Sequence, residues 1–279
     1  MSSIGEIELL RLMAAPPAVL ALVFGFLATL TALTSWAGFV VERSHYGRRR
    51  RIWEVALAPG QYRWEAAAGV RFVLIATLAF TLAISSGAVH FGLTTAASFA
   101  TTFLSCLLFF EVFYYFLHRA LHTKALVRFH RHHHRSKVGT PLTGLSMSVV
   151  ETLGWMVGYL APPLLLSRFL PVSLEAWSLY LVYHWGGNII GHINVELMPP
   201  LAGRRVLSLF AHPFTYHALH HARWTGHFAL YTTLLDRAFG TEWTDWGALQ
   251  QKVLSEKPLT HLREQGSDSE ISMPAPGLG

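Results

Sequence analysis

The sequence is poor in charged residues and in cysteine, and both shortages limit what the protein can be. Charged side chains make up 14% of its 279 residues, whereas soluble domains usually contain about 25%. With 52% apolar residues and a mean hydropathy of +0.36, the composition favours an integral membrane protein. Cys106 is the only cysteine, which excludes a disulfide within the chain and a thiolate metal site. Metal chemistry would therefore depend on histidine, of which there are 16.

Signals for several common functions are also missing. No short apolar segment with a small-residue cleavage site opens the chain, so we expect no removable signal peptide. No G-x-G-x-x-G motif follows a strand pattern, which argues against a bound nicotinamide or flavin dinucleotide. The net charge is +6, but the basic residues flank apolar segments instead of forming a separate domain. This distribution favours anionic lipid headgroups over nucleic acid.

Long apolar runs are present in place of charge. A transmembrane helix takes about 20 residues, and the first run meets this on length alone. Pro162, Pro163 and Pro171 crowd the junction of the last two runs, which form either a full hairpin or a shallow re-entrant pair. Strand patterns are sparse, so we predict an all-α integral membrane protein with four to five transmembrane helices. The runs are Ala14 to Val41, Phe72 to Val89, Ala97 to Leu117, Leu145 to Leu166, and Leu174 to Ile193.

The basic residues predict how these spans are oriented. Arg43 and the run 48–51 follow the first span, which places that loop in the cytoplasm by the positive-inside rule. The loop at 90–96 has no Lys or Arg, as an outside loop should. The segment after the third span is basic again and should be cytoplasmic, with a helical cap on that face. Its basic residues are Lys124, Arg128, Arg131, Arg135 and Lys137.

Histidines recur at helical spacing after the third span. A helix advances about 100° per residue, so positions i, i+3 and i+4 share a face and each set can aim its imidazoles at one point. Eight imidazoles exceed what one tetrahedral ion accepts, so the pattern predicts two metals and a dinuclear metalloenzyme. His132 falls off the shared face and is expected to lie outside the ligand set. The spaced sets are His118 and His122, then His130, His133 and His134, then His217, His220 and His221.

Two other functions share some of these features. A metal transporter or metal-storing protein with a histidine-rich loop would place ionisable residues along several spans, and a zinc-dependent membrane hydrolase would share the site geometry. Away from their ends, the spans hold only Glu111, Glu151 and His184. Both carboxylates are either functional or hydrogen-bonded structural residues. His184 fits a buried structural histidine, and the enzyme is the favoured interpretation.

The order of these motifs resembles that of a known family. H-x-x-x-H is followed by H-x-x-H-H, an isolated histidine at His192 and a second H-x-x-H-H, and residues 236–241 read D-R-A-F-G-T. This order over residues 110–241 is similar to the fatty acid hydroxylase and sterol desaturase superfamily. The resemblance implies a membrane non-haem di-iron enzyme that uses dioxygen to hydroxylate or desaturate a lipid, such as a sterol or a fatty-acyl chain.

The resemblance also implies which residues hold the metals. Asn188 stands where some relatives have a further histidine, so it would reach an iron directly or through water. Two positions depart from the family pattern: Leu235 replaces a common aromatic, and Gly226-His227 replaces Asn-Tyr or Asn-Phe. Glu196 and Asp236 are candidates to orient the imidazoles through their second nitrogen. The implied ligands are His118, His122, His130, His133, His134, Asn188, His192, His217, His220 and His221.

The implied chemistry sets the cofactors and partners. Oxidation of an unactivated C–H bond needs a redox metal, so two iron ions are expected, with O2 as co-substrate. Zinc could fill the site but would give no turnover. Because no electron-carrying cofactor motif is present, a separate carrier protein must supply electrons. We expect an acidic carrier on the basic cytoplasmic face.

Three regions are predicted along the chain. Residues 1–97 form an N-terminal membrane region with two spans and a basic loop. Residues 98–247 form the catalytic domain. Residues 248–279 form a C-terminal tail that is partly disordered, because 266–279 is rich in Ser, Gly, Pro and acidic residues.

Overall fold

The described part of the chain is entirely helical. A computed structural model describes residues 15–201 and 205–266, and between these limits it contains helices and three isolated β-bridges but no strand. The all-α prediction is therefore confirmed. The tail for which disorder was predicted lies outside the described residues, apart from Gly266.

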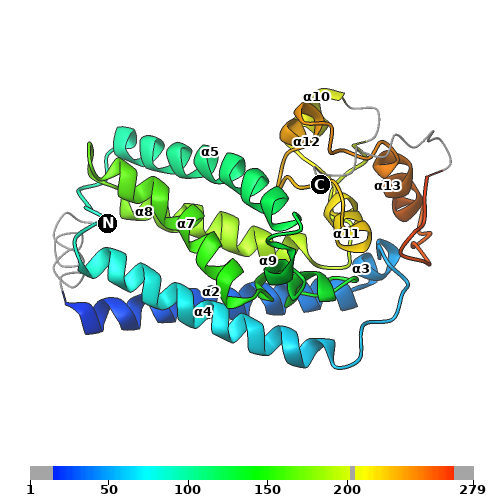
Figure 1. Cartoon of the computed structure of the whole chain (residues 1–279), viewed down its shortest axis with the longest axis horizontal. Coiled ribbons are helices and arrows are strands. Elements are labelled where there is room, and N and C mark those ends of the chain that lie inside the picture. The colour runs from blue at the N-terminus through cyan, green and yellow to red at the C-terminus, as the bar shows by residue number, and fades with distance from the viewer. Residues whose placement is uncertain (1–14, 202–204, 267–279) are drawn as a thin grey trace.

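Four long helices form a bundle that runs along the long axis of the molecule (Figure 1). They are α2 (Pro16–Arg43), α4 (Gln61–Ser85), α5 (Ala96–Leu121) and α7 (Val149–Leu166), and each is long and apolar enough to cross a membrane. Their outer faces carry large exposed apolar side chains, such as Leu82 at 72% exposure, as expected for helices solvated by lipid. The protein is an integral membrane protein with four candidate spans.

The fifth apolar run is helical without a break over residues 174–191, but it is not one regular α-helix. It is divided into α8 (Leu174–Leu181), a π-helical turn η3 (Val182–Gly186) and the short α9 (Gly187–Gly191). The lower of the two predicted span counts is therefore the one found in the described residues. π-Helical turns often occur at functional sites, and only α9 separates this one from His192.

The ends of two spans position the site. Thr95 accepts a hydrogen bond from the backbone N–H of Ser98 and begins α5, which runs for 26 residues and ends at Leu121, between the first two spaced histidines. Ser148 accepts from the N–H of Glu151 and begins α7. Glu151 therefore lies in the first turn of a span, at the same end of the bundle.

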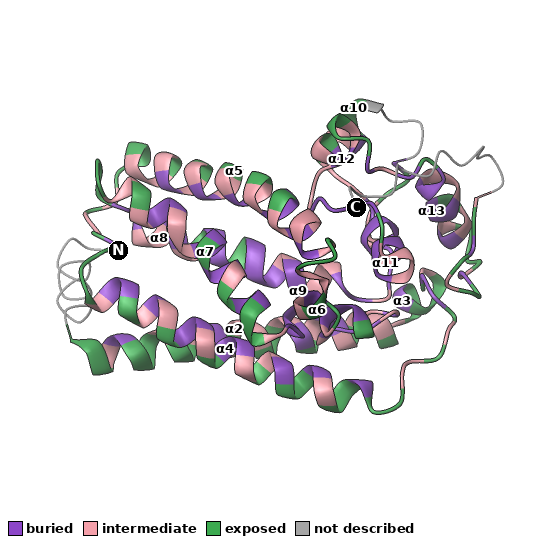
Figure 2. Cartoon of the chain, in the orientation of Figure 1, coloured by how far each residue is buried: buried purple, intermediate pink, exposed green. Residues whose placement is uncertain are grey.

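Short helices form a cap at this end of the bundle (Figure 1). Its own apolar core includes Trp53, Tyr216, Leu219 and Trp243, and is separate from the main core of the bundle. In Figure 2 the ribbons of α11 and α13 are largely in the colour of buried residues. The short helices are α3 (His45–Arg49), α6 (Val127–His130), η1 (His133–Arg135), η2 (Thr143–Leu145), α10 (Arg205–Phe210), α11 (Phe214–Arg223), α12 (Leu234–Ala238) and α13 (Trp246–Leu254).

The beginning of the predicted C-terminal tail belongs to this cap. Helix α13 crosses residue 247, the predicted boundary, and packs against α11. Leu249, Val253 and Leu259 are buried in the core of the cap. The domain boundary itself stays a prediction.

Candidate metal centre

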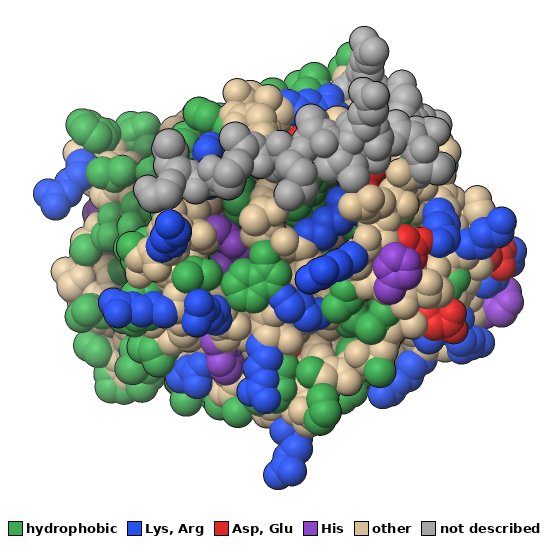
Figure 3. Space-filling view, turned by 45° about the vertical axis from the view of Figure 1, so that its right-hand side comes forward, with side chains coloured by type: hydrophobic (Ala, Val, Ile, Leu, Met, Phe, Trp, Pro, Cys, Tyr) green, Lys and Arg blue, Asp and Glu red, His purple; other side chains and the backbone are tan. Residues whose placement is uncertain are grey.

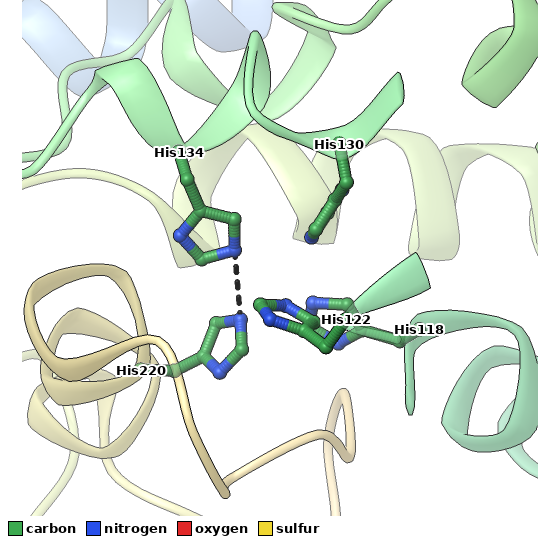
Figure 4. Close-up of side chains that lie close together, drawn as sticks. All are labelled: His118, His122, His130, His134 and His220. Carbon is green, nitrogen blue, oxygen red and sulfur yellow. Dashed lines mark hydrogen bonds between the residues drawn. The ribbon is translucent and has the colours of Figure 1, made fainter. Parts of the chain in front are cut away.

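Nine histidines gather in two adjacent groups where the bundle meets the cap. Within each group, one nitrogen of every imidazole lies within 4.8 Å of the others. Figure 4 shows the larger group, whose rings converge from separate elements. We call the sets the five-histidine group (His118, His122, His130, His134 and His220) and the four-histidine group (His133, His192, His217 and His221).

The structure corrects one expectation about the H-x-x-H-H motifs, which each divide between the two groups. Helix α6 ends at His130 and a 3-10 turn begins at His133, so His133 and His134 point to different sides. In α11, His217 and His221 share a face, while His220 lies about 100° away from His221. Each motif therefore contributes to both histidine groups and does not aim at one point.

Fixed hydrogen bonds set the tautomer of five imidazoles. A carbonyl oxygen can only accept, so a ring nitrogen bonded to one carries the hydrogen and leaves a lone pair on the other nitrogen. In each case Nδ1 donates and Nε2 faces inward. The acceptors are Phe228 O for His118 (2.9 Å), Glu151 Oε1 for His130 (2.7 Å), Asn188 O for His192 (2.6 Å), Gly226 O for His220 (2.7 Å) and Ser136 O for His221 (2.9 Å).

The inward nitrogens fit a pair of metal ions. Nε2 of His192 lies 2.9 Å from Nε2 of His217 and 3.3 Å from Nε2 of His133, and Nε2 of His220 lies 3.0 Å from Nε2 of His134. Such facing nitrogens are typical of ligands around a shared cation. The buried Nε2 atoms of His118, His122, His130 and His221 have no hydrogen-bond partner among the described residues. An all-nitrogen set suits iron, copper or zinc.

Burial keeps these side chains in the form that binds metal. Desolvation lowers the pKa of His133, His134, His217, His220 and His221 well below the usual value for histidine, and lowers the pKa of His192 to about 4. All six are therefore neutral at neutral pH, as metal ligation requires.

Glu151 is the carboxylate that contacts a metal-facing imidazole. Its Oε1 accepts from His130 Nδ1 and, at 3.3 Å, from Trp155 Nε1, and the residue is buried. Glu111, the other carboxylate predicted within a span, accepts from the N–H of Thr232 (3.1 Å) and its hydroxyl (2.8 Å) instead. It therefore holds a loop of the cap.

Glu196 and Asp236 do not contact an imidazole. Glu196 accepts from the backbone N–H (2.9 Å) and hydroxyl (2.8 Å) of Thr215 in the first turn of α11, where a carboxylate offsets the unpaired N–H groups. Asp236 accepts from the N–H of Phe228 at 2.9 Å, and the carbonyl of Phe228 holds His118. Both hold backbone next to the grouped histidines instead, and Glu151 and four main-chain carbonyls accept from the second nitrogen of five of the nine imidazoles.

Other candidates lie around the two groups. The side-chain amide of Asn188 donates to Gly144 O at 2.6 Å, and its main-chain carbonyl accepts from His192, so metal ligation by this side chain stays a prediction. His132 lies outside both groups, with its ring edge against Trp64. His184 is also outside both groups and is enclosed by the rings of Phe110 and Tyr180, at 4.5 and 4.7 Å.

Glu65 is a functional candidate that the sequence pattern did not reveal. This fully buried carboxylate of α4 accepts four hydrogen bonds. One comes from the hydroxyl of Ser136, whose carbonyl holds His221. A carboxylate shortly before a long apolar run was the available signal, but the apolar run was predicted to begin only at residue 72. The other three donors are Gln61, Thr140 and Thr143.

Trp224 is a second residue without a sequence signal. It follows α11 with a φ of 72°, a left-handed conformation that is rare for a bulky residue and often marks a functional site. Its ring packs on the ring of His134 with centroids 4.6 Å apart, and the ammonium of Lys137 lies 4.0 Å from its centroid. Trp224 thus connects the five-histidine group to the basic surface of the cap.

Comparison with known proteins assigns the family. The sequence profile described as fatty acid hydroxylase matches residues 103–241, a segment that contains all nine grouped histidines. The chain belongs to the fatty acid hydroxylase and sterol desaturase superfamily. The family named from the motif order is thereby confirmed. Glu65 lies outside the matched segment.

Curated relatives of this chain include plant proteins. The very-long-chain aldehyde decarbonylase CER1 of Arabidopsis thaliana is 31% identical over 54% of this chain and 26% of its own length. The very-long-chain aldehyde decarbonylase GL1-6 of Oryza sativa subsp. indica is 34% identical over 54% of this chain and 26% of its own. The match therefore spans about a quarter of these relatives. No solved structure matches the chain.

Proposed function

We propose that this protein is a membrane-bound non-haem di-iron oxidoreductase that uses O2 and external electrons to modify a lipid. The observation that carries this proposal is the pair of adjacent all-histidine groups at the end of an apolar bundle. Iron held by both groups would supply dioxygen activation, which redox-inactive zinc does not. The protein supplies the imidazole lone pairs and the hydrogen bonds that orient them.

The substrate is proposed to be a long aliphatic lipid. Family membership favours hydroxylation or desaturation, whereas the names of the relatives add a second candidate, loss of the carbonyl carbon from a very-long-chain aldehyde. All of these reactions act on a hydrocarbon chain that the apolar helices can solvate. The products distinguish them: a gain of oxygen, a loss of two hydrogens, or a hydrocarbon one carbon shorter.

We place the histidine groups on the cytoplasmic side, with an acidic electron carrier docking on the cap. Four cations there are exposed and form no ion pair with any acid of the described residues. Figure 3 shows more Lys and Arg than Asp and Glu across this face. Trp224 contacts both Lys137 and His134. We propose that electrons from the carrier pass through its ring to the five-histidine group. The cations are Lys124, Arg128, Arg131 and Arg135.

Metal analysis and product analysis together test this function. We expect about two irons per purified chain. We also expect oxidation of an added long-chain fatty acid, fatty aldehyde or sterol when a reduced plant-type ferredoxin and O2 are supplied. His133→Ala and His220→Ala each remove a ligand from one group and should abolish turnover, whereas His261→Ala, at an exposed position of the cap, should not. Turnover by the zinc-loaded protein without iron would instead indicate a hydrolase.

Protease protection tests the orientation separately. In intact cells a tag fused to the C-terminus should resist external protease, because the last described helix belongs to the cap. Digestion of the tag in sealed cells would overturn the cytoplasmic assignment and leave the metal chemistry unaffected.

A further inference from the structure

A pocket of about 260 Å³ reaches one of the two histidine groups and not the other. His192 and His217, both of the four-histidine group, form part of its wall. No member of the five-histidine group lines it. The four-histidine group also offers one imidazole fewer than its neighbour, so it has more room for a further ligand.

The rest of the wall, as far as the described residues form it, is uncharged. None of these residues is Lys, Arg, Asp or Glu, and most are aromatic or aliphatic, such as Phe214, Leu230 and Tyr231. A charged headgroup would lose its hydration here without gaining a partner. The volume is also smaller than the roughly 300–1,000 Å³ typical of sites for drug-sized ligands, which favours a linear chain over fused rings.

The outer wall of the pocket is apolar and exposed. Phe210 and Tyr183 line the pocket and are themselves 63% and 44% exposed. Val206 and Leu207, on the same short helix α10 as Phe210, are exposed as well. Clustered apolar side chains at a surface mark contact with a membrane or a ligand, and here they lie beside a bundle whose outer face is equally apolar.

We propose that this pocket admits the aliphatic chain of an uncharged lipid from the bilayer and presents one of its carbons to the four-histidine group. The proposal rests on the proposed function and adds to it a path by which the substrate enters and a separate role for each histidine group. The four-histidine group faces the substrate. The five-histidine group faces Trp224 and the basic surface, where electrons would arrive.

Gly191 provides a direct test, because it lines the pocket and a Cβ added there meets nothing within 4 Å. Gly191→Phe should fill the pocket without displacing backbone. The probe is a methyl octadecanoate that carries a photoactivatable diazirine near its methyl end, added to zinc-loaded protein in detergent. Zinc makes labelling independent of turnover, so a failure of this proposal is distinguishable from a failure of the iron chemistry.

We expect the wild-type protein to be labelled on peptides that contain Tyr183, Phe210 or Tyr231. Gly191→Phe should reduce this labelling at least tenfold while two zinc ions remain bound. Gly25→Phe is the matched control: Gly25 is exposed on α2, and its added Cβ also meets nothing within 4 Å. It should leave labelling unchanged.

A second variant covers the case in which Gly191→Phe loses metal. Phe210→Asp places a charge at the outer wall of the pocket and should also reduce labelling. Position 210 is separated in sequence from every grouped histidine. Unchanged labelling in a metal-loaded Gly191→Phe protein would overturn the proposal. So would label concentrated at the larger apolar cavity of about 340 Å³ between α2 and α4, which contains no histidine.

Discussion

Replacing Glu65 should weaken one metal position and spare the other. Its Oε1 accepts from Gln61, Ser136 and Thr143 at 2.7–2.8 Å, and its Oε2 accepts from Thr140 at 2.6 Å. Glu65→Ala leaves four buried donors without an acceptor. Each unpaired buried group costs about 1–3 kcal/mol. Because the hydroxyls can bond to one another after relaxation, we expect a net loss of about 3–5 kcal/mol, the range for breaking a buried charged pair.

The variant Glu65→Gln separates charge from hydrogen bonding. A Gln side chain can keep its oxygen at the Oε1 position and retain three of the four bonds, so that only the bond from Thr140 is lost. We therefore expect it to cost only about 1–2 kcal/mol. The melting temperature in detergent should fall clearly for the Ala variant and little for the Gln variant.

Metal titration of the apoprotein gives the specific readout. Ser136 joins Glu65 to His221, so Glu65→Ala should weaken zinc binding to the four-histidine group by about 10- to 100-fold. Zinc binding to the five-histidine group should stay close to that of the wild type. Glu54→Ala is the control, because Glu54 is exposed and precedes the same helix. Equal weakening of both ions, or of neither, would refute the reasoning.

Three further outcomes follow from the geometry. Glu151→Gln keeps an acceptor for His130 but removes the charge, and isothermal titration should show about tenfold weaker metal binding at the five-histidine group. Gly144→Ala places a Cβ 2.6 Å from Asn188 O, the acceptor for His192. It should lower the free energy of unfolding by about 1–3 kcal/mol and lower metal occupancy. Gly69→Ala, whose added Cβ has its nearest contact at 3.9 Å, should do neither. Burial lowers the pKa of the grouped histidines outside the spans, so below pH about 6.5 the unfolded chain binds more protons than the folded one. The free energy of unfolding of the apoprotein should therefore be steady from pH 8 to 7 and fall with acidification below about 6.5, by up to about 1.4 kcal/mol per pH unit for each histidine. The melting temperature should follow it, and a melting temperature unchanged at pH 5.5 would contradict this.

The sequence predicted the class of fold because apolar length and histidine spacing are local patterns. The all-helical membrane bundle and the family followed from them. The division of each H-x-x-H-H motif between two groups was not predictable, since it depends on the 3-10 turn at His133. The hydrogen-bond acceptors of the imidazoles could not be predicted either. Four of these acceptors are main-chain carbonyls, which every residue possesses. Glu196 and Asp236 were plausible by residue type, but their acceptor atoms are taken by backbone N–H groups.

The interleaving of the two histidine groups makes their occupancy interdependent. The segment 130–134 and helix α11 each send ligands to both groups, so the first ion to bind fixes backbone that the second ion also needs. The ordering entropy is then lost mainly at the first step, which makes loading positively cooperative. A substitution within either shared segment should therefore affect both ions, whereas one at Glu65 or Glu151, which lie outside these segments, should act mainly on one group.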